Sequence, residues 1–212
     1  EASADQRAGA FARRFRIDGR RGHGLLVVLI TAALALFVVS RFAVTEVVLW
    51  ADWSANAARA FIVVGPVFAA WSAMLASRHA KANRVDLLEA TATPVIWREL
   101  GHATMGILAA LACYGIVAAV VLGYAARHAT WGGPDWWLVL FGGAMSALYA
   151  LGGWLMGTFA PGRLTPVVAG ALTFLYTVVS YASGMAASGN DAFQPWRYIE
   201  GRWALGNRLF YE

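Results

Sequence analysis

The chain has 212 residues, of which 59% are hydrophobic and 14% charged, and it contains 10 Trp. Soluble domains average about 45–50% apolar and about 25% charged residues, so this composition excludes an ordinary soluble protein and predicts a membrane protein. The net charge is +5, and in a membrane protein the placement of Lys and Arg in the loops indicates the orientation of the chain. The positive charge therefore does not indicate nucleic acid as a partner.

Residues 1–23 form a basic segment that we expect to be cytoplasmic. The segment starts at Glu1 without Met and has no small-residue cleavage site, which indicates a trimmed N-terminus and not a signal peptide. Phe11 and Phe15 would share one helical face, as in a helix lying on the anionic inner leaflet. A solvated basic tail is the alternative.

Five apolar runs approach or exceed the roughly 17–25 residues that a helix needs to cross a bilayer. They predict an all-α polytopic membrane bundle within residues 24–187, with spans at 24–42, 57–76, 103–126, 138–159 and 166–187. Cys113 is the lone cysteine, so no intrachain disulfide can form. Residues 188–212 are polar and aromatic, and we expect them to lie along the outer membrane surface.

Basic residues set the expected orientation. With a cytoplasmic N-terminus, eleven of the 17 Lys and Arg face the cytoplasm, and the positive-inside rule favours that arrangement. The eleven are Arg7, Arg13, Arg14, Arg16, Arg20, Arg21, Arg78, Lys81, Arg84, Arg98 and Arg163. Seven Trp then fall in or beside exterior segments, where amphipathic rings prefer the interface: Trp50, Trp53, Trp131, Trp136, Trp137, Trp196 and Trp203.

Three of the predicted spans contain small residues or a helix-breaking proline. Pro66, after Gly65, predicts a kink in the second span, either a hinge or a static bend. Gly153 and Gly157 permit close helix approach, either within one chain or between two. In the fifth span, Thr173, Thr177 and Ser180 share one helical face, which predicts a helix contact or a substrate path.

The segment 77–102 is a long, charged, cytoplasmic connection. A helix is expected over 83–91, ending near Thr93 because Pro94 disfavours helix in the residue before it, and a second short helix should lead into the third span. A short helix that mixes apolar and charged residues suits docking of a cytosolic protein. An ordinary amphipathic connection between two spans is the alternative.

This connection resembles the coupling loop of the permease subunits of bacterial ABC-2 type exporters. The matching residues are Asp86-Leu87-Leu88, Thr93-Pro94 and Glu99-Leu100-Gly101; Asp86 stands where Glu is more usual in the family, and His102 where Lys is common. The resemblance implies that the segment from Arg84 to Pro94 contacts a separate cytosolic ABC ATPase. The implied contact residues are Arg84, Asp86, Leu87, Leu88, Glu89, Thr93, Pro94, Arg98 and Glu99. It also implies a homo- or heterodimer of permeases, and a sixth span in the full protein.

The sequence therefore predicts a transport subunit of a bacterial plasma membrane and not an enzyme. The only lysine, Lys81, precedes Ala82, so these residues contain no Gly-Lys-Ser/Thr nucleotide-binding core, and ATP hydrolysis would belong to the partner. No cofactor or metal is expected. A proton- or ion-driven carrier is disfavoured, because no Asp or Glu lies at mid-depth in any predicted span. Hydrophobic walls with hydroxyls suit drugs, lipids or amphipathic natural products. A membrane scaffold subunit of a larger complex is the alternative.

Overall fold

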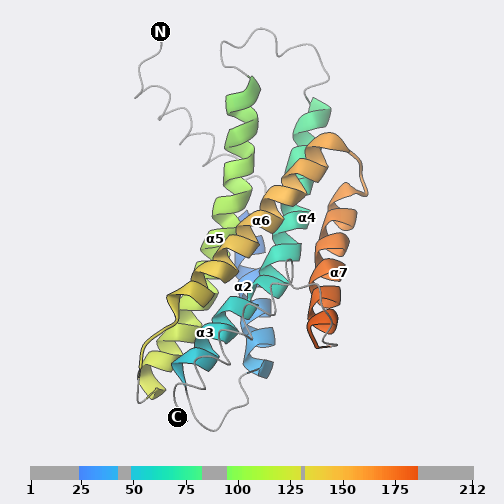
Figure 1. Ribbon diagram of the computed structural model, residues 1–212. Helices are drawn as coiled ribbons and strands as arrows, with labels where there is room; N and C mark the ends of the chain where they lie inside the picture. Colours follow the sequence, from blue (N-terminus) through green and yellow to red (C-terminus); the bar gives the residue numbers. More distant parts are fainter. Residues whose placement is uncertain (1–23, 43–48, 83–94, 130–131, 186–212) are drawn as a thin grey trace, which may run out of the picture.

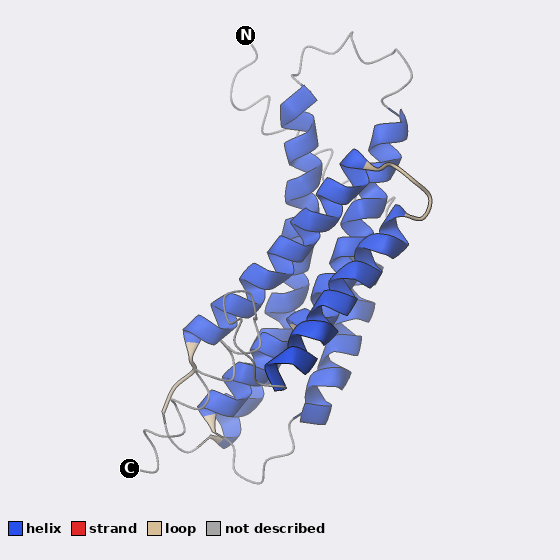
Figure 2. Ribbon diagram, turned by 45° about the vertical axis from the view of Figure 1, so that its right-hand side comes forward, coloured by secondary structure: helices blue, strands red, loops and turns tan. Residues whose placement is uncertain are grey.

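The computed structural model describes residues 24–42, 49–82, 95–129 and 132–185. Within these ranges the regular structure is entirely helical and contains no strand (Figure 2). The helices are α2 Gly24–Phe42, α3 Trp50–Arg59, α4 Phe61–Ala82, α5 Val95–His128, α6 Trp136–Phe159 and α7 Thr165–Met185. The predicted all-helical class is confirmed.

Four stretches of the described chain are long and apolar enough to cross a membrane: Gly24–Arg41, Trp50–Arg78, Ala103–His128 and Trp136–Phe159. They overlap the first four predicted spans, at 24–42, 57–76, 103–126 and 138–159. The fifth predicted span corresponds to α7, whose apolar stretch Thr165–Ser180 is shorter. The chain is therefore a multi-pass membrane protein of the helical-bundle type.

Two helix boundaries differ from the sequence prediction. The second span starts earlier, because α3 and α4 are separated only by a turn at Ala60, whose N–H bonds the carbonyl oxygen of Ala57 at 3.2 Å. The third span is continuous from Val95, so the predicted separate short helix is wrong. Both helices can continue because no proline that would remove a helical hydrogen bond lies between Trp50 and Val64 or between Val95 and His128.

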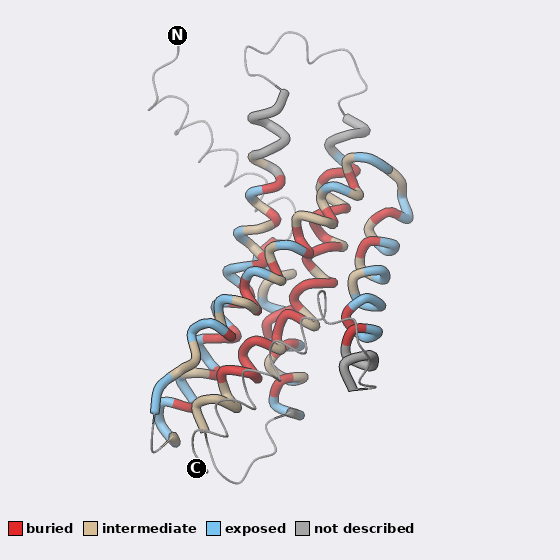
Figure 3. The backbone as a smooth tube through the Cα atoms, in the orientation of Figure 1, coloured by how far each residue is buried: buried red, intermediate tan, exposed pale blue. Residues whose placement is uncertain are grey.

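The helix α4 lies at the centre of the bundle. It packs against α2, α5, α6 and α7, and successive long helices run in alternating directions (Figure 1). The buried residues concentrate along α4 and on the sides of its neighbours that face it (Figure 3). The outer sides of α2 and α7 instead expose large apolar residues, as expected for surfaces that contact lipid.

Glycines allow α6 to cross α4 at short range. A Cβ atom built at Gly157 would lie 2.9 Å from Ala73 Cα, and one at Gly153 would lie 2.6 Å from Ala69 Cα. Neither position has room for a side chain, since real Cβ atoms do not approach so closely. The predicted Gly153 and Gly157 pair therefore serves a contact within this chain.

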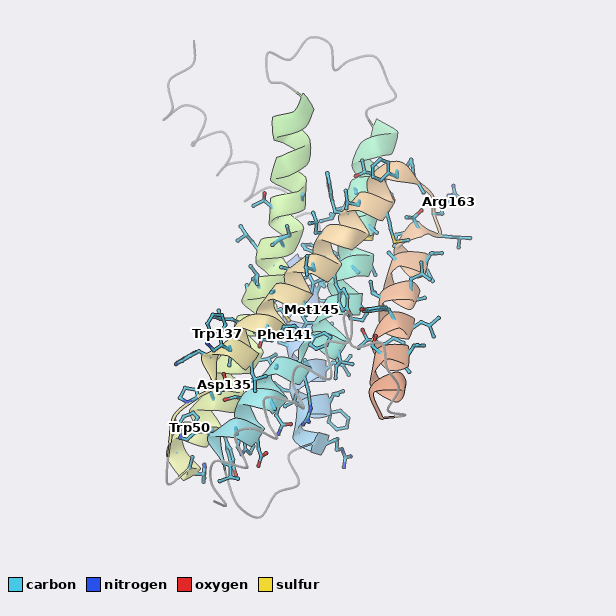
Figure 4. The ribbon with its side chains drawn as sticks, in the orientation of Figure 1. Trp50, Asp135, Trp137, Phe141, Met145 and Arg163 are labelled. Atoms are coloured by element: carbon cyan, nitrogen blue, oxygen red, sulfur yellow. The ribbon has the colours of Figure 1, made fainter. Side chains whose placement is uncertain are left out.

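One end of the bundle is rich in aromatic residues. At the start of α6, Trp136 and Trp137 are exposed, and nearby the Trp53 and Tyr124 rings lie 4.7 Å apart between centroids (Figure 4 shows Trp50 and Trp137 at this end). The carboxylate of Asp135 caps α6 by accepting a hydrogen bond from the Trp137 N–H at 3.1 Å. Exposed Trp and Tyr at a helix end are typical of a membrane interface.

Candidate functional site

The predicted ATPase contact falls largely outside the described residues. Arg84, Asp86, Leu87, Leu88, Glu89, Thr93 and Pro94 lie outside them, whereas Arg98 and Glu99 belong to α5, of which only the backbone is described at those positions. The structure does describe the two helices that flank this segment. The lengths of these two helices and their register determine where the two ends of segment 83–94 are attached to the bundle.

The two flanking helices end at the same level. Gly106 of α5 lies against Ser72 of α4, because a Cβ built at Gly106 would be 3.3 Å from Ser72 Cβ. From this contact α4 runs ten further residues to Ala82, and α5 starts eleven residues earlier at Val95. At 1.5 Å per residue both helices extend on the order of 15 Å beyond their contact.

These two ends project past the neighbouring turn between α6 and α7. The Ser77 hydroxyl donates to the Gly157 carbonyl oxygen at 3.5 Å, so these residues share one level. The helix α6 ends at Phe159, two residues further on, whereas α4 continues to Ala82. Figure 1 shows the ends of α4 and α5 protruding beyond the turn that carries Arg163, which is labelled in Figure 4.

That turn is closed by the side chain of Thr165. Its hydroxyl accepts a hydrogen bond from the Gly162 N–H at 3.0 Å and donates one to the Ala160 carbonyl. The hydroxyl therefore binds the turn backbone instead of the first N–H groups of the helix. The result is a closely tied connection between the antiparallel helices α6 and α7.

The second candidate site is the hydroxyl face of α7. Thr177 is 1% exposed and Ser180 is 5% exposed, while Thr173 is partly buried. Thr177 donates a hydrogen bond to the Thr173 carbonyl at 2.8 Å, and Thr173 donates to the Ala169 carbonyl at the same distance. The predicted face exists and points into the bundle, towards α4 and α6.

Sequence reasoning missed Tyr149, which completes this site. Its hydroxyl lies 3.0 Å from Thr177 Oγ1. Since the Thr177 proton goes to the Thr173 carbonyl, Tyr149 is the donor in this bond. The available signal was that Tyr149 is the one aromatic residue on an α6 face that otherwise consists of Leu138 and of small residues such as Gly142 and Ser146.

The position of Tyr149 depends on Gly65 of α4. A Cβ at Gly65 would lie 2.8 Å from Tyr149 Cε2, so the ring occupies the space that a side chain at Gly65 would need. The Phe61 ring lies 6.1 Å from the Tyr149 ring, and the Tyr176 ring 6.4 Å from it, between centroids. Hydroxyls framed by aromatic rings suit the hydrogen-bonding group of an amphipathic molecule.

Within the described residues, no group of three or more His, Cys, Asp or Glu could hold a metal ion. The side chains brought together at Tyr149 are hydroxyls and rings, which bind and orient but supply no strong acid or base. Comparison of the chain with protein-family models, with curated protein sequences and with solved structures finds no match.

Proposed function

We propose that this chain is the membrane permease subunit of an ATP-driven ABC exporter, with its N-terminus in the cytoplasm of a bacterial cell. One observation supports this best: α4 and α5 end level with each other and project beyond the rest of the bundle on both sides of segment 83–94. The projecting ends of these two antiparallel helices would present the segment that connects them to a cytosolic partner. The acidic-Leu-Leu pattern at Asp86-Leu87-Leu88 lies there.

The mechanism is mechanical transmission. A cytosolic ATPase that grips segment 83–94 would push on the ends of α4 and α5. Because α4 packs against α2, α5, α6 and α7, a displacement of its end reaches every other long helix of the described bundle. Closely packed interiors pass on such a displacement instead of absorbing it. In a dimer of permeases this would change the side of the membrane that a shared cavity faces.

The transported molecule would be a drug, a lipid or an amphipathic natural product. The side chains available inside the described bundle are mostly apolar groups, aromatic rings and hydroxyls, such as those of Tyr149, Thr177 and Ser180. They match a molecule with a large apolar body and few hydrogen-bonding groups. ATP binding and hydrolysis would take place in the partner.

Charge reversal in the loop tests the proposal. The double variant Asp86→Lys and Glu89→Lys should abolish ATP-dependent export from reconstituted vesicles and release a co-purifying ATPase, because it changes the charge of the docking segment. The matched control is Arg163→Glu, which also reverses charge, on an exposed residue at the same end of the bundle. It should retain at least half of the export rate.

Export unaffected by the double variant would overturn the coupling role. The competing function, a scaffold subunit, predicts a different pattern: the double variant would release a cytosolic partner that hydrolyses no ATP, and the intact complex would transport nothing in the presence of ATP.

A further inference from the structure

We infer that α7 is a movable helix, closed on the bundle by a latch that consists of Gly65, Tyr149 and Thr177. The latch joins three helices: the Tyr149 ring of α6 lies over Gly65 of α4, and its hydroxyl reaches Thr177 of α7 at 3.0 Å. This inference does not depend on the identity of any ATPase or substrate.

The first argument is the nature of the buried face of α7. In its described part, the buried residues are Thr165, Ala169, Thr177 and Ser180, all small. Most of its large residues lie on the opposite side, and Val167, Leu175 and Val179 are all more than half exposed. Lipid tails are as apolar as these side chains, so no hydrophobic force presses α7 onto the bundle, and hydrogen bonds and close packing must hold it.

The second argument is the geometry of attachment. At one end α7 is tied by the turn from Ala160 to Thr165, which Thr165 closes through its hydroxyl. Further along, Gly170 packs against α4, where an added Cβ would be 3.1 Å from Ala70 Cβ. The Tyr149 hydroxyl binds α7 seven residues beyond Gly170. A helix fixed at one end and held by a hydrogen bond nearer the other is arranged as a hinged element.

The third argument is that the latch can be released at small cost. A hydrogen bond between helices in a membrane contributes modestly, so its removal should raise the ratio of open to closed α7 by about threefold on average, and by up to about 20-fold. Release uncovers the hydroxyls of Thr173, Thr177 and Ser180 to the bilayer. An amphipathic molecule carrying a hydroxyl group could then replace Tyr149 as the donor to Thr177 Oγ1.

The test uses a cysteine reporter on the covered face. In a Cys113→Ala background, Ser180→Cys is reacted with a membrane-permeant maleimide, and the labelling rate reports the open population. Tyr149→Phe and Thr177→Val should each raise this rate by about 3- to 20-fold. Gly65→Ala should do the same, because its methyl group displaces the Tyr149 ring. Thr177→Ser keeps the hydroxyl and should label at the original rate.

The matched control is Tyr114→Phe. Tyr114 is also a buried tyrosine, and its hydroxyl donates to the Val139 carbonyl of α6 at 2.7 Å, so this variant loses a comparable bond at the α5–α6 contact. It should leave Ser180→Cys labelling unchanged. Equal effects of Tyr149→Phe and Tyr114→Phe would overturn the latch, since they would show general loosening.

A second measurement covers the case in which the reporter variant does not fold. Spin labels at Leu148 of α6 and Val179 of α7, both exposed, leave the packed faces intact. Tyr149→Phe should increase a longer-distance population between the labels, and Tyr114→Phe should not. An unchanged distance distribution in Tyr149→Phe would contradict the inference.

Discussion

At the scale of single residues, glycine decides how closely α6 approaches α4. Gly153 and Gly152 are neighbours on the same helix, yet only Gly153 meets another backbone, whereas a Cβ at Gly152 would meet nothing within 4 Å. The close approach of the two helices therefore requires glycine at position 153 but not at position 152. This contrast makes the two residues a matched pair for measuring the packing of the bundle.

Gly153→Ala should destabilise the bundle by about 1–3 kcal/mol, because its methyl group overlaps the Ala69 backbone. Gly152→Ala should be neutral or stabilising by up to about 1 kcal/mol, since alanine is the better helix former. The measurement is the unfolding midpoint of each purified variant in detergent, followed by circular dichroism. Equal midpoints for both variants would show that α6 does not cross α4 at Gly153.

At the scale of helices, the register between α4 and α5 determines how segment 83–94 is presented. The approach of Gly106 to Ser72 sets this register, and from it follows that Ala82 and Val95 lie at one level. Had the helices been offset by two turns, one end would lie about 11 Å below the other. A partner gripping the segment would then act mainly on a single helix.

A disulfide tests that register. In the Cys113→Ala background, Ser72→Cys with Gly106→Cys should crosslink on mild oxidation, because the corresponding Cβ atoms would lie near the 3.5–4.5 Å range of disulfides. The control pair, Ser72→Cys with Gly115→Cys, uses a glycine of α5 at which an added Cβ would meet nothing within 4 Å, and it should stay reduced. The readout is the count of free thiols in the unfolded protein. Crosslinking of the control pair alone would disprove the register.

At the scale of the whole molecule, the two ends of the bundle differ in character. Trp136 and Trp137 lie exposed at the end where α5 finishes and α6 begins, and Arg163 lies exposed at the opposite end, where α4 and α5 project. Aromatic side chains mark an interface without choosing a side, whereas basic residues favour the cytoplasm. The proposed orientation therefore places the projecting helix ends in the cytoplasm.

Cysteine labelling of intact cells tests the orientation. In the Cys113→Ala background, a membrane-impermeant maleimide should label Arg127→Cys, at the aromatic end, without permeabilisation. Arg163→Cys should be labelled only after permeabilisation. Each variant removes one positive charge from an exposed residue, so the two are matched for their effect on insertion. The reverse labelling pattern would place the projecting ends outside and exclude a cytosolic ATPase partner.

The sequence alone was sufficient for the helical class and for the approximate spans. Bilayer thickness imposes a minimum length on every apolar run that crosses it. Inside the bilayer no water is available to bond the backbone N–H and C=O groups, so they must bond one another within a helix. The sequence also identified the hydroxyl face of Thr173, Thr177 and Ser180 from helical periodicity. The helix starts at Trp50 and Val95 were not predicted from the sequence, because an apolar run locates the part of a helix that crosses the membrane, and the helix can continue beyond that run.

Only the tertiary structure decided which faces meet. Gly65, Tyr149 and Thr177 lie far apart in the chain, and their junction requires α6 to cross α4 at one angle and register, which periodicity within a single helix cannot encode. Periodicity also cannot predict the contact of Gly106 with Ser72, which brings the ends of α4 and α5 to the same level. Periodicity defines a face of one helix, whereas the partner of that face follows from how glycines and small residues allow several helices to pack at once.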